Sequence, residues 1–420
     1  MSRTIKKKIL LISDNMTCPS GVAVQSQYLA LGLAATEKYR VVQLGAMLAI
    51  PGPANTITQF SADVSICPMV GFDNLFLYRK MLLEYQPDVC ILFHDPRFFQ
   101  SLFSIHDEVH QVCPIIYWHL WDNCDMSPDF HRVMYDIVDQ VNCINYDTYC
   151  FVKTVKENAE YIPHGLTEAT FYPLQDMEIT RKKQEMLPGR AGHFVLLYVS
   201  RSAPRKRAPD VLLAFKSFLE EQAALEGKPP RATLVMHLNP NDPAGAPLIE
   251  ITTKLGLSEH VVFSARTLSE SEMNSLYNIA DCMITIPYAE GFGLSTLHGL
   301  FCGVPMIANA TGGLKRQVRN PYTNFVHGVE LVPDRMLVGS IKDGCPYILQ
   351  DMARMPDIVR AIQRIYRMDP SERKRLGQAG REYALREYSL EKMIADWDRS
   401  IETTLHRWRS THSRWRATRV

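Results

Sequence analysis

Short apolar runs alternate along most of the chain with longer stretches whose apolar residues recur at helical spacing. In the first half, apolar runs predict strands at 8–13, 40–46, 63–67, 88–94, 114–120, 141–145 and 160–165. In the second half, similar runs predict strands at 194–200, 232–238, 260–265, 282–287 and 304–310. Alternation of strands and helices is typical of parallel sheets covered by helices on both faces.

The pattern divides the chain into two α/β halves. Residues 176–192 are polar and contain no long apolar run, so they predict an interdomain linker. We therefore expect one Rossmann-like domain over 1–175 and another over 193–375, facing each other across a cleft. Residues 376–420 predict helices that pack back on the first domain and end in a basic tail. Residues 320–351 carry turn residues and short strands that the pattern does not assign individually.

Composition and charge narrow the class of protein. Of the 420 residues, 46% are hydrophobic and 22% charged, which permits a large core and excludes general disorder. A formal charge of +1 argues against a partner held by the charge of the whole molecule. The ten cysteines include no C-x-x-C pair, which predicts reduced thiols and no zinc site. The first apolar run is too short to span a membrane, so a cytoplasmic protein is expected.

The stretch YAEGFGLSTLHG, residues 288–299, predicts a ligand site. Gly291 and Gly293 permit a tight turn and close approach of a ligand after the strand, and a helix is expected to begin near Ser295. The free N–H groups of a helix start attract anions. The carboxylate of Glu290 beside them suits a ligand with both phosphates and hydroxyls. An exposed glutamate on a glycine turn is the structural alternative.

Basic residues predict a second part of this site. Arg201 and Lys206 follow the strand at 194–200, where a guanidinium and an ammonium suit a diphosphate. A solvated basic loop is the alternative, because Arg205 and Arg207 stand beside them. The tripeptide PSG, which ends at Gly21, leads into another predicted helix at 21–37, whose start faces the same cleft.

Taken in order, these motifs resemble the family 4 glycosyltransferases of the GT-B fold, which move a sugar from a nucleotide donor with retention of anomeric configuration. The likeness is carried by PSGVAVQSQYLALGL, EYIPHGLTEATFYP, VSRSAPRKRAPDVLLAF and the segment from LYNIAD through YAEGFGLSTLHG to ATGGL. The last of these is specific and the first is weak. The resemblance implies an acceptor side in the first domain and a donor side in the second.

The resemblance also implies roles for matched positions. Glu290 would bind hydroxyls of the transferred sugar, while Arg201 and Lys206 would neutralise the diphosphate. Gly21 would let the first domain approach it. The implied donor site comprises Gly21, Arg201, Lys206, Glu290, Gly291, Phe292, Gly293, Leu294 and His298. No metal or other cofactor is expected, because cations and helix dipoles take that part.

Some positions depart from the family pattern. Ser20 replaces the first glycine of the usual pair, and Arg207 stands where a glycine often follows the lysine. His298 occupies the place of a second glutamate that usually binds the ribose, and an imidazole is no bidentate anionic acceptor, so the donor nucleotide stays open. The family commonly has a histidine near the donor sugar. His94 and His119 both end predicted strands, and we prefer His119 for this catalytic position because it matches the place of the family's histidine.

The predicted function is retaining transfer of a hexose or pentose to a hydroxyl acceptor. Two alternatives stay open: a nucleotide-sugar epimerase or hydrolase on the same fold, and a non-catalytic nucleotide-sugar-binding protein. A nicotinamide dehydrogenase is disfavoured, because no G-x-G-x-x-G follows the first strand and 291–296 lacks its third glycine.

The acceptor depends on features outside these motifs. The last fourteen residues, RWRSTHSRWRATRV, carry five arginines, two tryptophans and no acid. Such a tail suits an anionic membrane or nucleic acid, with a disordered tail as the alternative. A loose likeness of TGGLKRQV to viral family members adds a modified DNA base to the candidate acceptors, which would place the protein in a host cytoplasm. Glycans, lipid-linked sugars and small alcohols are equally allowed, and the oligomeric state stays open.

Overall fold

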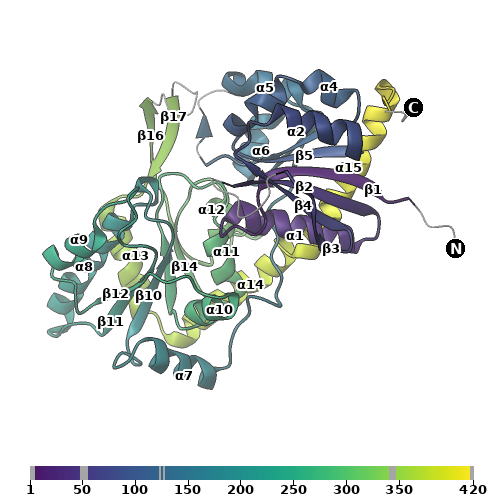
Figure 1. The fold of residues 1–420 in the computed structure, drawn as a ribbon. Helices are drawn as coiled ribbons and strands as arrows, with labels where there is room; N and C mark the ends of the chain where they lie inside the picture. The colour runs from purple at the N-terminus through teal and green to yellow at the C-terminus, as the bar shows by residue number, and fades with distance from the viewer. Residues whose placement is uncertain (1–4, 48–54, 123, 126–127, 340–346, 417–420) are drawn as a thin grey trace.

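The computed structural model describes residues 5–47, 55–122, 124–125, 128–339 and 347–416. Two α/β domains face each other, the first in purple and blue and the second in teal and green (Figure 1). A long C-terminal helix, drawn in yellow, runs from the second domain back along the first.

The first domain is built on an eight-stranded sheet of order β3-β4-β2-β1-β5-β6-β8-β9. Every pair is parallel except the β3–β4 hairpin. The strands are β1 (Lys7–Asp14), β2 (Tyr39–Met47), β3 (Thr58–Ser61), β4 (Val64–Val70), β5 (Val89–His94), β6 (Ile115–His119), β8 (Gln140–Cys143) and β9 (Ala159–Tyr161).

Helices cover both faces of this sheet. They are α1 (Gly21–Ala35), α2 (Leu75–Lys80), the π-helix η1 (Met81–Tyr85), the 3-10 turns η2 (Pro96–Phe99) and η3 (Pro128–His131), α3 (Gln100–Phe103), α4 (His106–His110), α5 (Arg132–Ile137) and α6 (Tyr146–Lys153). Along β1, Ile9 and Leu11 pack into one core and Leu10 and Ile12 into another. Burial on both faces explains why the central strands read as continuous apolar runs.

The second domain carries a six-stranded, all-parallel sheet of order β12-β11-β10-β13-β14-β15. Its strands are β10 (Phe194–Val199), β11 (Ala232–His237), β12 (Val261–Ser264), β13 (Cys282–Thr285), β14 (Met306–Asn309) and β15 (Gly328–Leu331). Its helices are η4 (Pro204–Lys206), α8 (Ala208–Glu226), α9 (Leu248–Lys254), α10 (Glu270–Asn278), α11 (Leu294–Phe301), α12 (Leu314–Val318), α13 (Met355–Arg367) and α14 (Pro370–Glu387).

Two helices lie where the chain passes between the domains. The polar segment expected as a linker contains α7 (Asp176–Met186). After α14, Ser389 caps α15 (Leu390–Thr411) by accepting a hydrogen bond from the Lys392 N–H. Ser400 of α15 and Asn142 of β8 exchange hydrogen bonds at 3.0 and 3.1 Å, so α15 packs on the first domain.

A small antiparallel sheet also joins the domains. The hairpin of β16 (Asp334–Gly339) and β17 (Tyr347–Met352) leaves the second domain, and β17 pairs with β7 (Cys124–Asp125) of the first. The hairpin stands at the upper left of Figure 1. It occupies part of the region 320–351, where the sequence predicted short strands without assigning them.

The basic tail is partly packed on the first domain. Trp408 is buried and stacks on His412, and the Arg414 guanidinium donates to the carbonyls of Gln86 and Pro87 at 2.8 and 2.9 Å. The Trp415 N–H donates to the Gln111 carbonyl at 2.7 Å. The disordered-tail alternative is therefore wrong as far as Arg416, the last described residue.

Most predicted strands are confirmed within a residue or two, but one is shorter than expected. The segment 160–165 contributes only Glu160 and Tyr161 to β9, because Pro163 has no N–H to donate to a ladder. Within the described ranges, every helix is too short or too polar to cross a membrane.

Candidate active site

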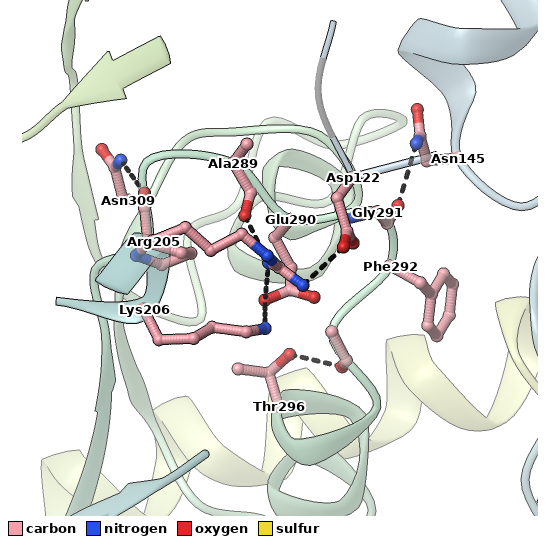
Figure 2. A network of polar contacts seen from close by, with 12 residues as sticks. Asp122, Asn145, Arg205, Lys206, Ala289, Glu290, Gly291, Phe292, Thr296 and Asn309 are labelled. Carbon is pink, nitrogen blue, oxygen red and sulfur yellow. Dashed lines mark hydrogen bonds and ion pairs between the residues drawn. The ribbon is translucent and has the colours of Figure 1, made fainter. Parts of the chain in front are cut away.

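The loop between β13 and α11 lies at the junction of the two domains (Figure 2). Gly293 caps α11 with φ 92°, a left-handed backbone that favours glycine. A Cβ at Gly312 would lie 2.0 Å from the Glu290 carbonyl oxygen, and one at Gly313 would lie 2.5 Å from Phe292 Cα. The two glycines after β14 therefore let that segment pack directly under the loop.

Glu290 is buried and surrounded by cations. Its Oε2 forms an ion pair with Lys206 and lies 3.7 Å from Nη1 of Arg205 (Figure 2). Burial acts to raise the pKa of Glu290, but the charges of Lys206 and Arg205 outweigh it and hold the pKa below its ordinary value. The carboxylate is therefore ionised at neutral pH.

The first domain contributes two side chains to the loop. Asp122, after β6, accepts from Nη2 of Arg205 at 2.5 Å and from the Gly291 N–H at 3.2 Å. Asn145, after β8, donates to the Gly291 carbonyl at 2.8 Å (Figure 2). A gap of about 20 Å³ remains beside these contacts, so the domains are nearly closed at this point.

Comparison with known proteins relates this region to a family of enzymes. Residues 180–335, which include the whole loop, match the family profile of glycosyl transferases group 1. The chain carries a glycosyltransferase group 1 domain. In the described part of the chain, no group of three or more His, Cys, Asp or Glu side chains is arranged to hold a metal ion.

Curated relatives of this glycosyltransferase domain match over part of their length. The D-inositol 3-phosphate glycosyltransferase of Salinispora tropica is 28% identical over 216 residues, which cover 49% of this chain and 42% of the relative. The protein of the same name from Mycobacterium sp. (strain KMS) is 33% identical over 130 residues, covering 31% and 27%. The chain thus matches less than half the length of these relatives.

Solved structures match almost the whole chain at low identity. Sucrose-phosphate synthase from Thermosynechococcus elongatus superposes with a TM-score of 0.74 at 17% identity, covering 96% of this chain and all of the other. Anabaena Alr3699/HepE, crystallised with UDP-glucose, gives 0.68 at 16% identity, covering 94% and 99%. These likenesses confirm the predicted GT-B fold of two Rossmann-like domains facing across a cleft.

Several predicted residues of the glycosyltransferase domain do meet at the loop. Lys206, Glu290, Gly291 and Phe292 lie together in Figure 2. Gly21 comes from the other domain, and a Cβ on it would lie 2.9 Å from Cδ1 of Leu294. The starts of α1 and α11 are therefore close, and a larger residue at position 21 would displace the Leu294 side chain.

Arg201 does not join this cluster. Its side chain is 83% exposed, and its closest carboxylate is Asp242 at 3.8 Å. Arg205, which the sequence left as part of a solvated loop, lies beside Glu290 instead and donates to the Ala289 carbonyl at 2.8 Å. Arg205 is thus a second cation next to Glu290, in addition to the predicted Lys206, and it is one that sequence reasoning missed.

His119 lies against α5. It is buried, and its Nε2 lies 2.9 Å from the Tyr135 hydroxyl of α5, because that helix covers this end of the sheet. Burial lowers the pKa of His119 to about 3, so the ring is neutral. His94 is more open, and its Nε2 lies 3.3 Å from Oδ1 of Asp14. His94 is thus the more open of the two, and the preference for His119 as the histidine near the donor sugar stays a prediction.

His298 packs against an aromatic ring. It stacks flat on Phe171, with ring centroids 4.1 Å apart and an interplanar angle of 5°. Burial lowers its pKa to about 4. A neutral, stacked imidazole differs from the carboxylate that the family pattern has at this position. A contact between His298 and the ribose of the donor therefore stays a prediction.

Asp122 and Asn145 were also missed by sequence reasoning. Each follows a predicted strand by a few residues, and the carboxyl ends of parallel strands converge at one edge of a sheet. Their polar character at that edge was the available signal.

Proposed function

We propose that the protein transfers a sugar from a nucleotide-diphosphate donor to a hydroxyl acceptor, with retention of configuration. The observation that carries this proposal is the buried, ionised Glu290 between Lys206 and Arg205 at the start of α11. A carboxylate accepts hydrogen bonds from sugar hydroxyls, and cations with free helix amides bind phosphate oxygens. Both chemistries lie within one loop.

The proposed reaction needs charge stabilisation at the leaving group. Breaking the bond between the anomeric carbon and the diphosphate oxygen leaves negative charge on that oxygen. Lys206, the first-turn amides of α11 and Arg201 would stabilise this charge, with Arg201 moving in from its exposed position. The leaving phosphate then takes the proton of the acceptor hydroxyl on the same face of the sugar. Glu290 positions the sugar, and the protein needs no metal.

The donor would have to exchange contacts with the protein. In the structure, Lys206 is paired with Glu290 and Arg205 with Asp122, and the gap beside them is small. We propose that the domains separate to admit the donor, and that its diphosphate takes Lys206 while its sugar hydroxyls take Glu290. A pocket of about 620 Å³ between β12, α10 and α7, lined in part by Ser264 and Arg266, is the candidate place for the nucleoside.

The acceptor would enter from the first domain. The relatives and structural neighbours are named for transfer to inositol phosphate or for sugar-phosphate synthesis. They favour a polyhydroxylated small molecule over DNA or a membrane. The docked positions of Trp408 and Arg414 also weaken the basis for a polyanionic partner at the tail.

The test is a screen of nucleotide sugars with and without hydroxyl acceptors, read by product analysis and by the NMR coupling of the new anomeric proton. Transfer with the donor's own anomeric configuration supports the proposal. Free sugar or an epimer from donor alone would instead support the hydrolase or epimerase alternative, and donor binding without any product would support the binding protein.

A further inference from the structure

A second pocket, of about 660 Å³, opens where α12 meets the start of α6. It is lined by Tyr146, Ala310, Lys315, Arg316, Arg319, Pro321, Asn324, Glu330, Val332, Pro333, Arg335 and Asp351. Tyr146 belongs to the first domain, and the other lining residues belong to the second domain and the hairpin that leaves it. The pocket is therefore complete only when the domains are together.

Most of the cations in this pocket have carboxylate partners. Arg319 donates through Nε to Glu330 at 2.8 Å, and Arg335 donates through Nε to Asp351 at 2.8 Å. Lys315 pairs with Asp147 of α6. These ion pairs compensate the charge of three of the four cations that line the pocket. The fourth cation is Arg316.

Arg316 has no carboxylate and no hydrogen-bond acceptor among the described residues. Its guanidinium lies 4.1 Å from the ring centroid of Tyr146, 5.3 Å from that of Tyr161 and 5.7 Å from that of Tyr322. Aromatic faces stabilise the charge but accept none of the N–H hydrogen bonds in the plane of the guanidinium. The side chain therefore presents an uncompensated positive charge with free donors to an open pocket.

We propose that this pocket binds a compact anionic group, a phosphate monoester or a carboxylate, with Arg316 as its principal partner. A guanidinium forms paired hydrogen bonds with either group, and a half-buried one with free donors is well prepared for them. The aromatic rings hold the guanidinium in place, so little side-chain freedom is lost when the anion binds.

The position of the pocket makes the acceptor its natural ligand, an assignment that rests on the proposed function. Arg335 and Asp351 line both this pocket and the small gap that reaches Asp122 and Ala289. Arg316 also lies three residues after Gly313, whose N–H donates to the Glu290 carbonyl at 3.1 Å. A hydroxyl compound anchored here by its anion would extend toward the sugar-binding loop.

The test is calorimetric titration of the full-length protein with glucose 6-phosphate, with glucuronate as the carboxylate probe and glucose as the uncharged match. Wild-type protein should bind one or both anions more tightly than glucose. Arg316→Gln should weaken that binding by about tenfold or more, the usual effect of losing charge-assisted hydrogen bonds. Arg316→Lys, which keeps the charge, should lose less. Arg360→Gln, an exposed arginine on α13, should match wild type.

Two results would overturn the inference. One is equal anion binding by wild type and Arg316→Gln, with thermal unfolding showing both folded. The other is retention in Arg316→Gln together with loss in Lys206→Gln, which would put the anion at the donor cations. If the Arg316-dependent binding holds while no nucleotide sugar supports transfer, the anion site stands and the transferase proposal falls.

Discussion

Replacing Glu290 by Gln tests whether the buried carboxylate is held by its cations. The amide keeps the shape of the side chain but leaves Lys206 without its ion-pair partner. In the wild-type protein the side chain of Lys206 is 17% exposed and that of Glu290 is 11% exposed. Breaking a buried pair by removing one partner costs about 3–5 kcal/mol. Arg205 keeps Asp122 and the Ala289 carbonyl, so we expect the low end, about 3 kcal/mol of unfolding free energy.

The assay is equilibrium unfolding in urea at pH 7, with Glu259→Gln, an exposed carboxylate, as the matched control. The control should change the unfolding free energy by less than about 0.5 kcal/mol. The double variant Glu290→Gln with Lys206→Met should be less destabilised than the sum of the single variants, because no charge is then left unpaired. A loss for Glu290→Gln no larger than the control's, or strict additivity in the cycle, would refute the reasoning.

Further predictions concern catalysis, backbone and pH. The double variant Arg201→Ala with Lys206→Ala should abolish sugar transfer while circular dichroism stays native, and near-normal turnover would contradict the proposed diphosphate contacts. Gly293→Ala should lower the unfolding free energy by about 1–3 kcal/mol in the same urea assay, since φ is 92° and the new Cβ would lie 2.6 Å from Leu314 Cδ2; an unchanged midpoint would contradict this. Burial lowers the pKa of His298 to about 4, so below about pH 6.5 the unfolded chain protonates first and stability falls until about pH 4. His298→Phe, which keeps the stack on Phe171, should lose less stability between pH 7 and pH 5 than wild type does; identical slopes would argue against a neutral His298.

The sheets could be predicted from the sequence because burial on both faces leaves a clear mark. Residues such as Leu10 and Leu11 point to opposite sides of β1 and are both buried, so the run is apolar throughout. The β16–β17 hairpin had no such mark. Several of the β16 side chains are exposed, and β7, the strand that pairs with β17, lies over two hundred residues earlier.

The residues that meet at the loop could be predicted where they are close in sequence, and they were missed where a turn decides which side chain reaches Glu290. Arg201, Arg205 and Arg207 stand close together in sequence, and only the conformation of η4 decides which points toward Glu290. Arg207 adopts φ 59° and turns inward to bond Asp210 and the Ala353 carbonyl, while Arg205 turns toward the cleft. Asp122 reaches the loop from the other domain, and no short-range pattern encodes that contact.

The pairing of β7 with β17 limits how the halves of the molecule can move. The backbone hydrogen bonds between β7 and β17 resist a separation of the two domains more than they resist a rotation of one domain about this small sheet. If the pairing persists while the cleft opens, the motion is a rotation about this small sheet, and the widest displacement falls on the parts of each domain farthest from it.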